Sequence, residues 1–437
     1  MYKNAARYVS LSVAGMIGVS VYILADTFFI SLGFGADGLA VLNMTLPIYG
    51  LIYAIGAMLG LGFAVDYSIR KAQKLKTDTI FMEAIFWSIL ISIPFVLIGI
   101  FSPDGILRLL GADAELAQMG KEYTRLILCG SPLFMCNYSF MSFCRNDNAP
   151  SYAMIGSIAG SMYNIVFDYV FMFVAGLGFT GAALATVGCP VVTMLFCTAH
   201  FRSGKNGVPF RIGKPSLRHL LRCSSVGMSG FIGDFANGVT TAVFNFVMLG
   251  LAGNVAVAAY GVIANIALVC ISVNNGIAQG MQPLISKTFG KGEKENVAKL
   301  LKFGMIVMAA TSVAFVLVSF VFAKPLISIF NSEGNAELLA YAIPGIRKYF
   351  IGFLFAGINV MIIAYYSAIA EPKIVVIGSL LRGLILIVGF TPILAALLGM
   401  GGVWYSFAAA EIVTFVIILL LRRKKTRGIG EAVDVVE

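Results

Sequence analysis

Long apolar runs alternate with short polar breaks along the whole chain. A helix needs about 20 mainly apolar residues to cross the hydrocarbon core of a membrane, and each run is about that long or longer. The pattern therefore predicts twelve transmembrane helices and an all-α, polytopic membrane protein. The runs lie near residues 8–33, 38–64, 80–101, 122–144, 151–175, 181–201, 217–251, 255–282, 300–323, 343–369, 373–398 and 402–421.

Composition supports this interpretation. Of 437 residues, 59% are hydrophobic and only 12% are charged, against roughly 25% charged in soluble domains. The net charge of +10 does not indicate nucleic-acid binding, because the basic residues lie in short loops and not on a basic face with interleaved aromatics. The seven cysteines fall in or beside apolar runs without a Cys-x-x-Cys pair, so they are interpreted as buried apolar residues.

Lysine and arginine are concentrated in alternate loops. If both termini are cytoplasmic, most of them lie on the cytoplasmic side, as the positive-inside rule requires. We therefore expect a multi-pass protein of the cell (inner or plasma) membrane with both termini inside. The opposite side holds only Arg108, Lys121, Arg125, Lys324, Arg347 and Lys348.

An internal repeat is visible at an offset of about 220 residues. Gly56 and Gly60 recur as Gly276 and Gly280. Two halves of six spans each enter the membrane from the same side, which predicts two parallel-related six-helix bundles around a central cavity. Other matched features are Pro103 and Pro325, Ala114-Glu115-Leu116 and Ala336-Glu337-Leu338, and Pro150 and Pro372.

This repeat divides the chain. We expect an N-lobe over residues 1–201 (spans 1–6), a basic cytoplasmic linker over 202–218 that acts as a hinge, and a C-lobe over 219–421 (spans 7–12). Residues 422–437 form a tail that is first basic and then acidic. We expect a monomer whose other partners are membrane lipids.

Signatures of catalysis are absent from the sequence. No Gly-Lys pair is followed by Ser or Thr, so there is no P-loop for ATP. The two histidines, His200 and His219, lie at loop edges, which argues against a zinc centre. We therefore expect a transporter that is not an enzyme, has no cofactor or resident metal, and depends on an ion gradient.

A few carboxylates lie at membrane depth, where each costs at least about 2.5 kcal/mol. Asp26 lies in the first span and Asp168 in the fifth, with Asn164 four residues before Asp168 on the same helix face. Thr186 in the sixth span offers a hydroxyl at similar depth. Such hard oxygen ligands suit Na⁺ or a shared proton, so we predict that the four side chains converge on a cation or proton site. The alternative is that they only fix helix packing.

Further polar residues lie in the second half. Asp234 has Asn237 and Asn245 nearby, so function and structure are both open for it. Arg382 and Glu411 are predicted to form an ion pair between the last two spans. A substrate cavity for flat apolar cations is expected to use Phe143, Gln279, Met281 and Gln282.

Several motifs together resemble the multidrug and toxic compound extrusion (MATE) family, over essentially the whole chain. They are Ala25-Asp26-Thr27-Phe28-Phe29-Ile30 followed by Gly38-Leu39-Ala40, the Asn164 and Asp168 pair with Thr186, and Gln282-Pro283-Leu284-Ile285-Ser286 before Gly290-Lys291-Gly292. The resemblance implies export of cationic, amphipathic compounds in exchange for H⁺ or Na⁺ by alternating access. It also implies that Asp26, Asn164, Asp168 and Thr186 form the N-lobe cation site.

The resemblance is weaker in the C-lobe. Asp234 matches a seventh-helix carboxylate of one branch of the family, but that branch has an acid on the tenth helix where this chain has Asn359. Two other functions stay open at this point. A lipid-linked oligosaccharide flippase of the same superfamily would need a cavity rich in Arg and Lys, and a membrane sensor or scaffold would leave the polar pair in one half unexplained.

Overall fold

The computed structural model describes residues 1–110, 112–204, 206–329 and 335–433, without the side chains of residues 36, 234, 237, 254 and 422–433. Helices account for the secondary structure of these residues, which contain no strand. Eleven helices are long and apolar enough to cross a membrane, or twelve if a pair bent by 42° counts as one span. The prediction of an all-α membrane protein with twelve spans is confirmed.

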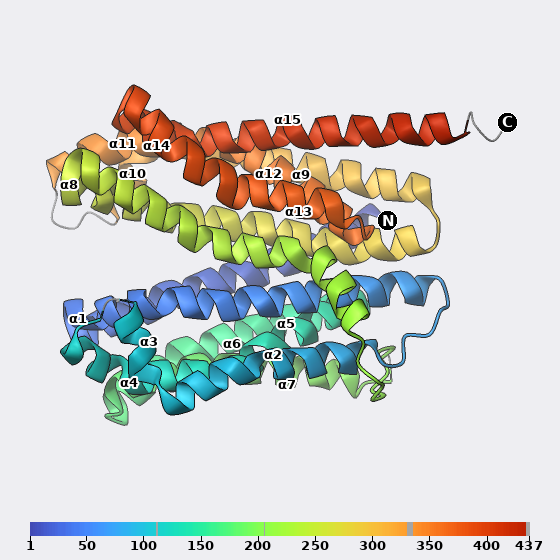
Figure 1. The fold of residues 1–437 in the computed structure, drawn as a ribbon, viewed down its shortest axis with the longest axis horizontal. Coiled ribbons are helices and arrows are strands. Elements are labelled where there is room, and N and C mark those ends of the chain that lie inside the picture. Colours follow the sequence, from blue (N-terminus) through green and yellow to red (C-terminus); the bar gives the residue numbers. More distant parts are fainter. Residues whose placement is uncertain (111, 205, 330–334, 434–437) are drawn as a thin grey trace.

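The helices of the first half are packed together on one side of the molecule (Figure 1). In chain order they are α1 (Tyr2–Ala72), α2 (Ile80–Phe101), α3 (Pro103–Leu109), α4 (Ala114–Cys129), α5 (Ser131–Asn146), α6 (Pro150–Tyr169), the π-helical turn η1 (Val170–Val174) and α7 (Gly178–Phe201).

The helices of the second half form the other side, and α1 and α8 make the most extensive contact between the two (Figure 1). The elements are α8 (Leu217–Gly290), α9 (Lys294–Val321), α10 (Ala323–Ser328), α11 (Ala336–Ile351), α12 (Phe353–Ala368), α13 (Pro372–Leu380), the π-helical turn η2 (Leu381–Ile385), α14 (Leu386–Leu398) and α15 (Met400–Val433).

Helices α1 and α8 each contain two spans joined at a break. The break in α1 is at Gly35 and that in α8 is at Ala252 and Gly253. Both glycines have positive φ, 59° and 68°, a conformation that costs glycine little because it lacks a Cβ. The chain reverses at each glycine and returns as the next span.

Equivalent helices of the two halves begin at the same local signals. The side chain of Asp113 caps α4, and that of Asn335 caps α11, one residue before each copy of the Ala-Glu-Leu repeat. Pro150 and Pro372 stand at the first turns of α6 and α13, where a proline costs no hydrogen bond. The repeat seen in the sequence is therefore a repeat of structure.

Glycines of the two Gly-x-x-x-Gly pairs lie at close helix contacts. A Cβ on Gly60 would lie 2.6 Å from the carbonyl carbon of Tyr138 within the first half. A Cβ on Gly276 would lie 2.6 Å from the Cα of Val13, and one on Gly280 2.8 Å from the Cα of Val9. The second pair therefore packs α8 directly against the first span, which joins the two halves.

Candidate functional site

Asp26 and Asp168 lie together inside the first half. Asp26 is carried by the first span of α1, and Asp168 by the end of α6, where the π-helical turn η1 begins two residues later. Their carboxyl groups are close enough to interact directly with each other. Asp168 is completely buried. Such π-helical turns are frequent at functional sites.

The other two predicted residues complete this group. Asn164 Nδ2 lies 3.4 Å from Thr186 Oγ1 and donates a weak hydrogen bond to it. Asn164 is completely buried and Thr186 is 5% exposed. The structure thus brings together, as two contacting pairs on α1, α6 and α7, the four residues that the sequence grouped.

Oxygen atoms in this group lack donors. Both carboxyl oxygens of Asp168, Oδ1 of Asp26 and Oδ1 of Asn164 are buried and accept no hydrogen bond from the described residues. Unpaired buried oxygens cost free energy, and two adjacent carboxylates in an apolar surrounding repel each other. A proton or a small cation would remove both costs.

Tyr123 is a neighbour that the sequence did not indicate. This buried tyrosine on α4 interacts electrostatically with both Asp26 and Asp168. Its ring packs against Phe179 with centroids 4.6 Å apart. No local motif marks it, because it comes from a helix remote in sequence from α1 and α6.

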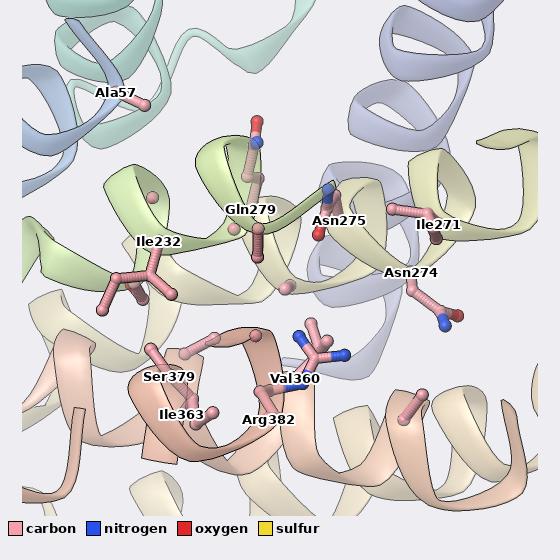
Figure 2. A pocket seen from close by; sticks show the side chains of 18 of the residues that line it. Ala57, Ile232, Ile271, Asn274, Asn275, Gln279, Val360, Ile363, Ser379 and Arg382 are labelled. Atoms are coloured by element: carbon pink, nitrogen blue, oxygen red, sulfur yellow. The ribbon is translucent and has the colours of Figure 1, made fainter. Parts of the chain in front are cut away.

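A cavity lies between the two halves. Met16, Ala57, Leu61 and Tyr138 contribute to it from the first half, and α8, α12, η2 and α15 supply most of the remaining wall. Its volume is about 150 Å³. Figure 2 shows Gln279 and Asn275 of α8 across this space from Arg382 of η2.

Of the four residues expected to line the cavity, two do and two do not. Gln279 and Gln282 line it, although each amide also has a partner: Arg145 Nη1 donates to Gln279, and Gln282 donates to Ser367. Met281 and Phe143 do not line it. Both are completely buried in separate apolar clusters, because an apolar pattern marks core and cavity wall alike.

The predicted ion pair of Arg382 and Glu411 is present, with Arg382 Nη2 2.7 Å from Glu411 Oε1. Asn359 is buried and does not line the cavity; it donates to Glu411 Oε2 at 2.7 Å and to the Glu411 carbonyl at 2.8 Å. The prediction for Asp234 lies outside the described residues, since the structure does not describe its side chain.

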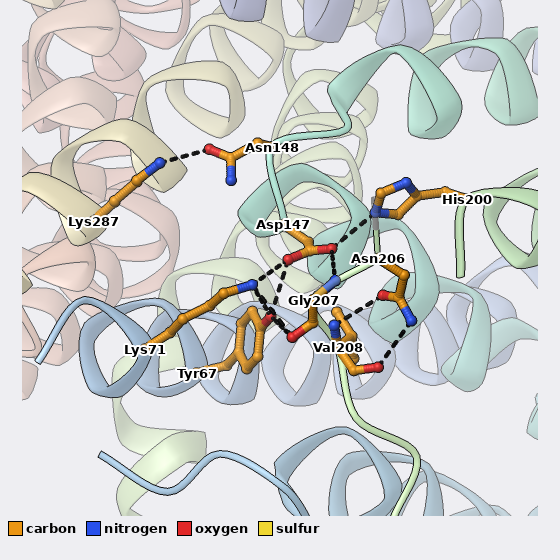
Figure 3. Close-up of polar contacts among 9 residues, drawn as sticks. All are labelled: Tyr67, Lys71, Asp147, Asn148, His200, Asn206, Gly207, Val208 and Lys287. Carbon is orange, nitrogen blue, oxygen red and sulfur yellow. Dashed lines mark hydrogen bonds and ion pairs between the residues drawn. The ribbon is translucent and has the colours of Figure 1, made fainter. Parts of the chain in front are cut away.

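A polar network surrounds Asp147, between α5 and α6 (Figure 3). Asp147 accepts hydrogen bonds from Lys71, Tyr67 and the Gly207 N–H, and pairs with His200 at 2.9 Å. Burial tends to raise the pKa of this carboxyl, but the hydrogen bonds from Lys71, Gly207 and His200 outweigh burial and lower it. The expected hinge at 202–218 is thus attached to the first half at Gly207.

His219 joins the start of α8 to the first half. Its Nδ1 lies 2.7 Å from Glu83 Oε2, and its Nε2 lies 3.1 Å from Asp66 Oδ2. Ligand atoms of Asp66, His219 and Cys223 lie within 4.8 Å of one another, a spacing that suits a metal. Because the imidazole nitrogens already pair with carboxylates and Asp66 pairs with Arg70, the geometry is that of an ion-pair network.

Comparison with known proteins identifies the family. The MatE family model matches residues 12–170 and again 234–393. The chain belongs to the MatE family. The two matches of one model agree with the internal repeat, and membership makes this protein a membrane transporter and not an enzyme.

Relatives of similar length support this assignment. The multidrug export protein MepA of Staphylococcus saprophyticus is 25% identical over 447 residues, covering 99% of this chain and 97% of that protein. MepA of Staphylococcus aureus strain NCTC 8325 is also 25% identical, covering 95% of this chain and 92% of that protein.

Solved structures share the fold. An outward-facing MATE family multidrug resistance transporter superposes with a TM-score of 0.90 at 24% identity, covering 98% of this chain and 96% of that one. A MATE protein in its straight conformation gives a TM-score of 0.88 at 24% identity, covering 98% of this chain and 97% of that one.

Proposed function

We propose that this MatE protein is a secondary antiporter that exports organic, mainly cationic amphipathic compounds in exchange for H⁺ or Na⁺. The observation that carries the proposal is the adjacency of Asp26 and Asp168 in a buried site with unpaired oxygens. The relatives named multidrug export proteins support the substrate class.

The carboxylate pair suits reversible cation binding. When a proton or Na⁺ is bound, the repulsion between Asp26 and Asp168 is relieved, and Asn164 and Thr186 supply neutral oxygens beside them. When the ion leaves, the pair is again destabilised. The energy of the site thus depends on occupancy, which is the requirement for coupling an ion gradient to a change of shape.

Close contacts between the halves support alternating access. A Cβ on Gly227 would lie 1.9 Å from the Met58 carbonyl oxygen, so α8 crosses α1 nearly backbone to backbone. Lys287 also donates to Asn148 across the halves at 2.8 Å (Figure 3). We infer that the conformation described is sealed at the end of the molecule where both termini lie. In the other conformation of the transport cycle, this end would be open.

The cavity favours export of organic compounds over flipping of a lipid-linked oligosaccharide. A pyrophosphate carrier needs several basic side chains, whereas Arg382 is the only basic residue among the described residues that line this cavity. The remaining wall offers amides and aromatic rings, such as Asn274 and Phe407.

Transport in proteoliposomes tests the proposal. Vesicles containing the purified protein are loaded with a cationic rhodamine ester, and its flux is followed under a pH gradient and, separately, a Na⁺ gradient. Flux that follows one of the gradients is expected and identifies the coupling ion. Equal flux with and without either gradient, or none at all, contradicts the proposal.

A further inference from the structure

The charged pair at the cavity wall is asymmetric. Glu411 is only 1% exposed, and its carboxylate accepts hydrogen bonds from Arg382 Nε, Arg382 Nη2 and Asn359 Nδ2. The Arg382 side chain is 23% exposed and lines the cavity. Both residues belong to the cavity wall, but Arg382 is by far the more exposed of the two.

Arg382 has donors to spare. Its bonds to Glu411 use Nε and Nη2, so Nη1 is engaged by none of the described residues. Figure 2 shows the guanidinium extending into the space toward α8. An arginine held along one edge presents its other N–H groups in fixed directions, which suits bidentate or paired recognition of a carboxylate.

The position of this arginine is fixed by its surroundings. It lies in the π-helical turn η2, and a Cβ on the next residue, Gly383, would lie 2.8 Å from the Cβ of Ala236 and 3.0 Å from Ile232. Buried ion pairs are often no more stabilising than apolar residues of the same volume. A contribution to folding stability alone therefore does not account for an ion pair at the cavity wall.

Two aromatic rings share the cavity wall with Arg382. Tyr349 and Phe407 stack with centroids 4.6 Å apart and planes 12° apart, and both line the cavity with Arg382. Flat rings in the same cavity wall as a guanidinium can contact a planar aromatic ligand while its acidic group reaches the arginine.

From this arrangement we infer that Arg382 is a specificity-determining residue that binds the carboxylate of planar, amphipathic substrates carrying an acidic group. Glu411 and Asn359 are positioning residues that hold the guanidinium. This inference rests on the proposed function and narrows it. The pair is neutral overall, so recognition comes from short-range hydrogen bonds and not from a long-range field.

Binding of a matched dye pair to the purified, detergent-solubilised protein tests the inference independently of transport. The probes are a rhodamine with a free carboxylate and the methyl ester of the same dye, which differ only in the acidic group. The measured quantity is the ratio of their Kd values by fluorescence polarisation. The wild-type protein is expected to prefer the free acid.

The decisive variant is the double substitution Arg382→Gln with Glu411→Gln, which removes both charges and leaves no unpaired buried carboxylate. We expect the preference for the free acid to fall about tenfold or more, the loss of one charge-assisted contact. Arg382→Lys keeps the charge without the planar fork and is expected to lose part of the preference. Arg347→Gln, on the exposed surface of α11, is the control and should keep the ratio.

An unchanged ratio in the double variant, or no preference for the acid in the wild-type protein, overturns the inference. Neither outcome concerns the proposed antiport, which is decided by gradient-driven flux of the ester. Loss of that flux with the acid preference intact would instead overturn the antiport and leave Arg382 as a carboxylate site.

Discussion

A Cβ on Gly62 would lie 2.0 Å from the carbonyl oxygen of Cys223, so α1 and α8 touch through their backbones at this crossing. The contact joins the second span of the first half to the first span of the second half. It leaves no room for a side chain in the conformation described. In the alternating access that we propose, this contact must separate for this end to open.

Gly62→Val should disfavour the sealed state. The added side chain cannot be accommodated without moving backbone, so we expect the halves to separate at this end and gradient-driven export to fall several-fold. Cys223, 1% exposed, should react faster with maleimide, followed by peptide mass spectrometry. Gly50→Val is the control, since nothing lies within 4 Å of its Cβ position. Unchanged labelling of Cys223 would show that this crossing does not control the closed state.

Asp26→Asn and Asp168→Asn should each uncouple transport. An amide neither takes up a proton near neutral pH nor supplies negative charge to Na⁺. We expect uphill accumulation of dye to fall at least tenfold, while downhill exchange continues. Asp37→Asn, at an exposed position near the α1 break, should behave as wild type. Normal uphill transport by either variant would place the coupling site elsewhere.

Asp147 should contribute a pH-dependent part of the stability. Because its folded pKa is lowered, its contribution is complete above the ordinary aspartate pKa of about 3.9 and is lost as the pH falls through the lower, folded value. Asp147→Asn should reduce the free energy of unfolding by about 1.5–3 kcal/mol near pH 7 and flatten this acidic dependence. Thermal unfolding between pH 7 and 3 measures both effects. Asp78 forms an exposed ion pair with Arg211, and Asp78→Asn should reduce the free energy of unfolding much less.

Asn359→Leu should release Glu411 from one of its donors. The variant leaves the buried Glu411 carbonyl and Oε2 without the amide bonds, which is expected to cost about 1–3 kcal/mol. It should also weaken the acid preference of the dye pair, because Arg382 is then less firmly held. Asn296→Leu, which removes a bond at the start of α9, is the matched control. A lower melting temperature with an unchanged dye ratio would limit Asn359 to a structural role.

Local signals made much of this fold predictable. The lengths of the apolar runs predict the helices. Capping residues such as Asp113 and Asn335 mark where equivalent helices begin in the two halves. Asp26, Asn164, Asp168 and Thr186 could be grouped because a carboxylate at membrane depth needs a partner. Tyr123 could not, since its approach to Asp26 depends on how α4 packs.

Two kinds of feature could not be predicted from the sequence: contacts between distant segments, and the surroundings of apolar side chains. Asp147 gathers Lys71, His200 and Gly207 from distant segments, and no spacing in the sequence indicates that. Met281 and Phe143 were assigned to the cavity because an apolar side chain that lines a cavity and one that packs in a core have the same sequence signature; both lie in cores.

The two π-helical turns have a consequence for how the halves diverged. Val170–Val174 follows Asp168, whereas Leu381–Ile385 precedes the positions that the repeat offset assigns to Asn164 and Asp168. Inserting or removing one residue in an α-helix rotates all the following side chains by about 100° around the helix axis. The equivalent positions in the second half are Leu386 and Phe390, which therefore need not face the direction that their counterparts face. Equivalent helices thus carry different interior surfaces, an amide and an acid in one and a guanidinium in the other.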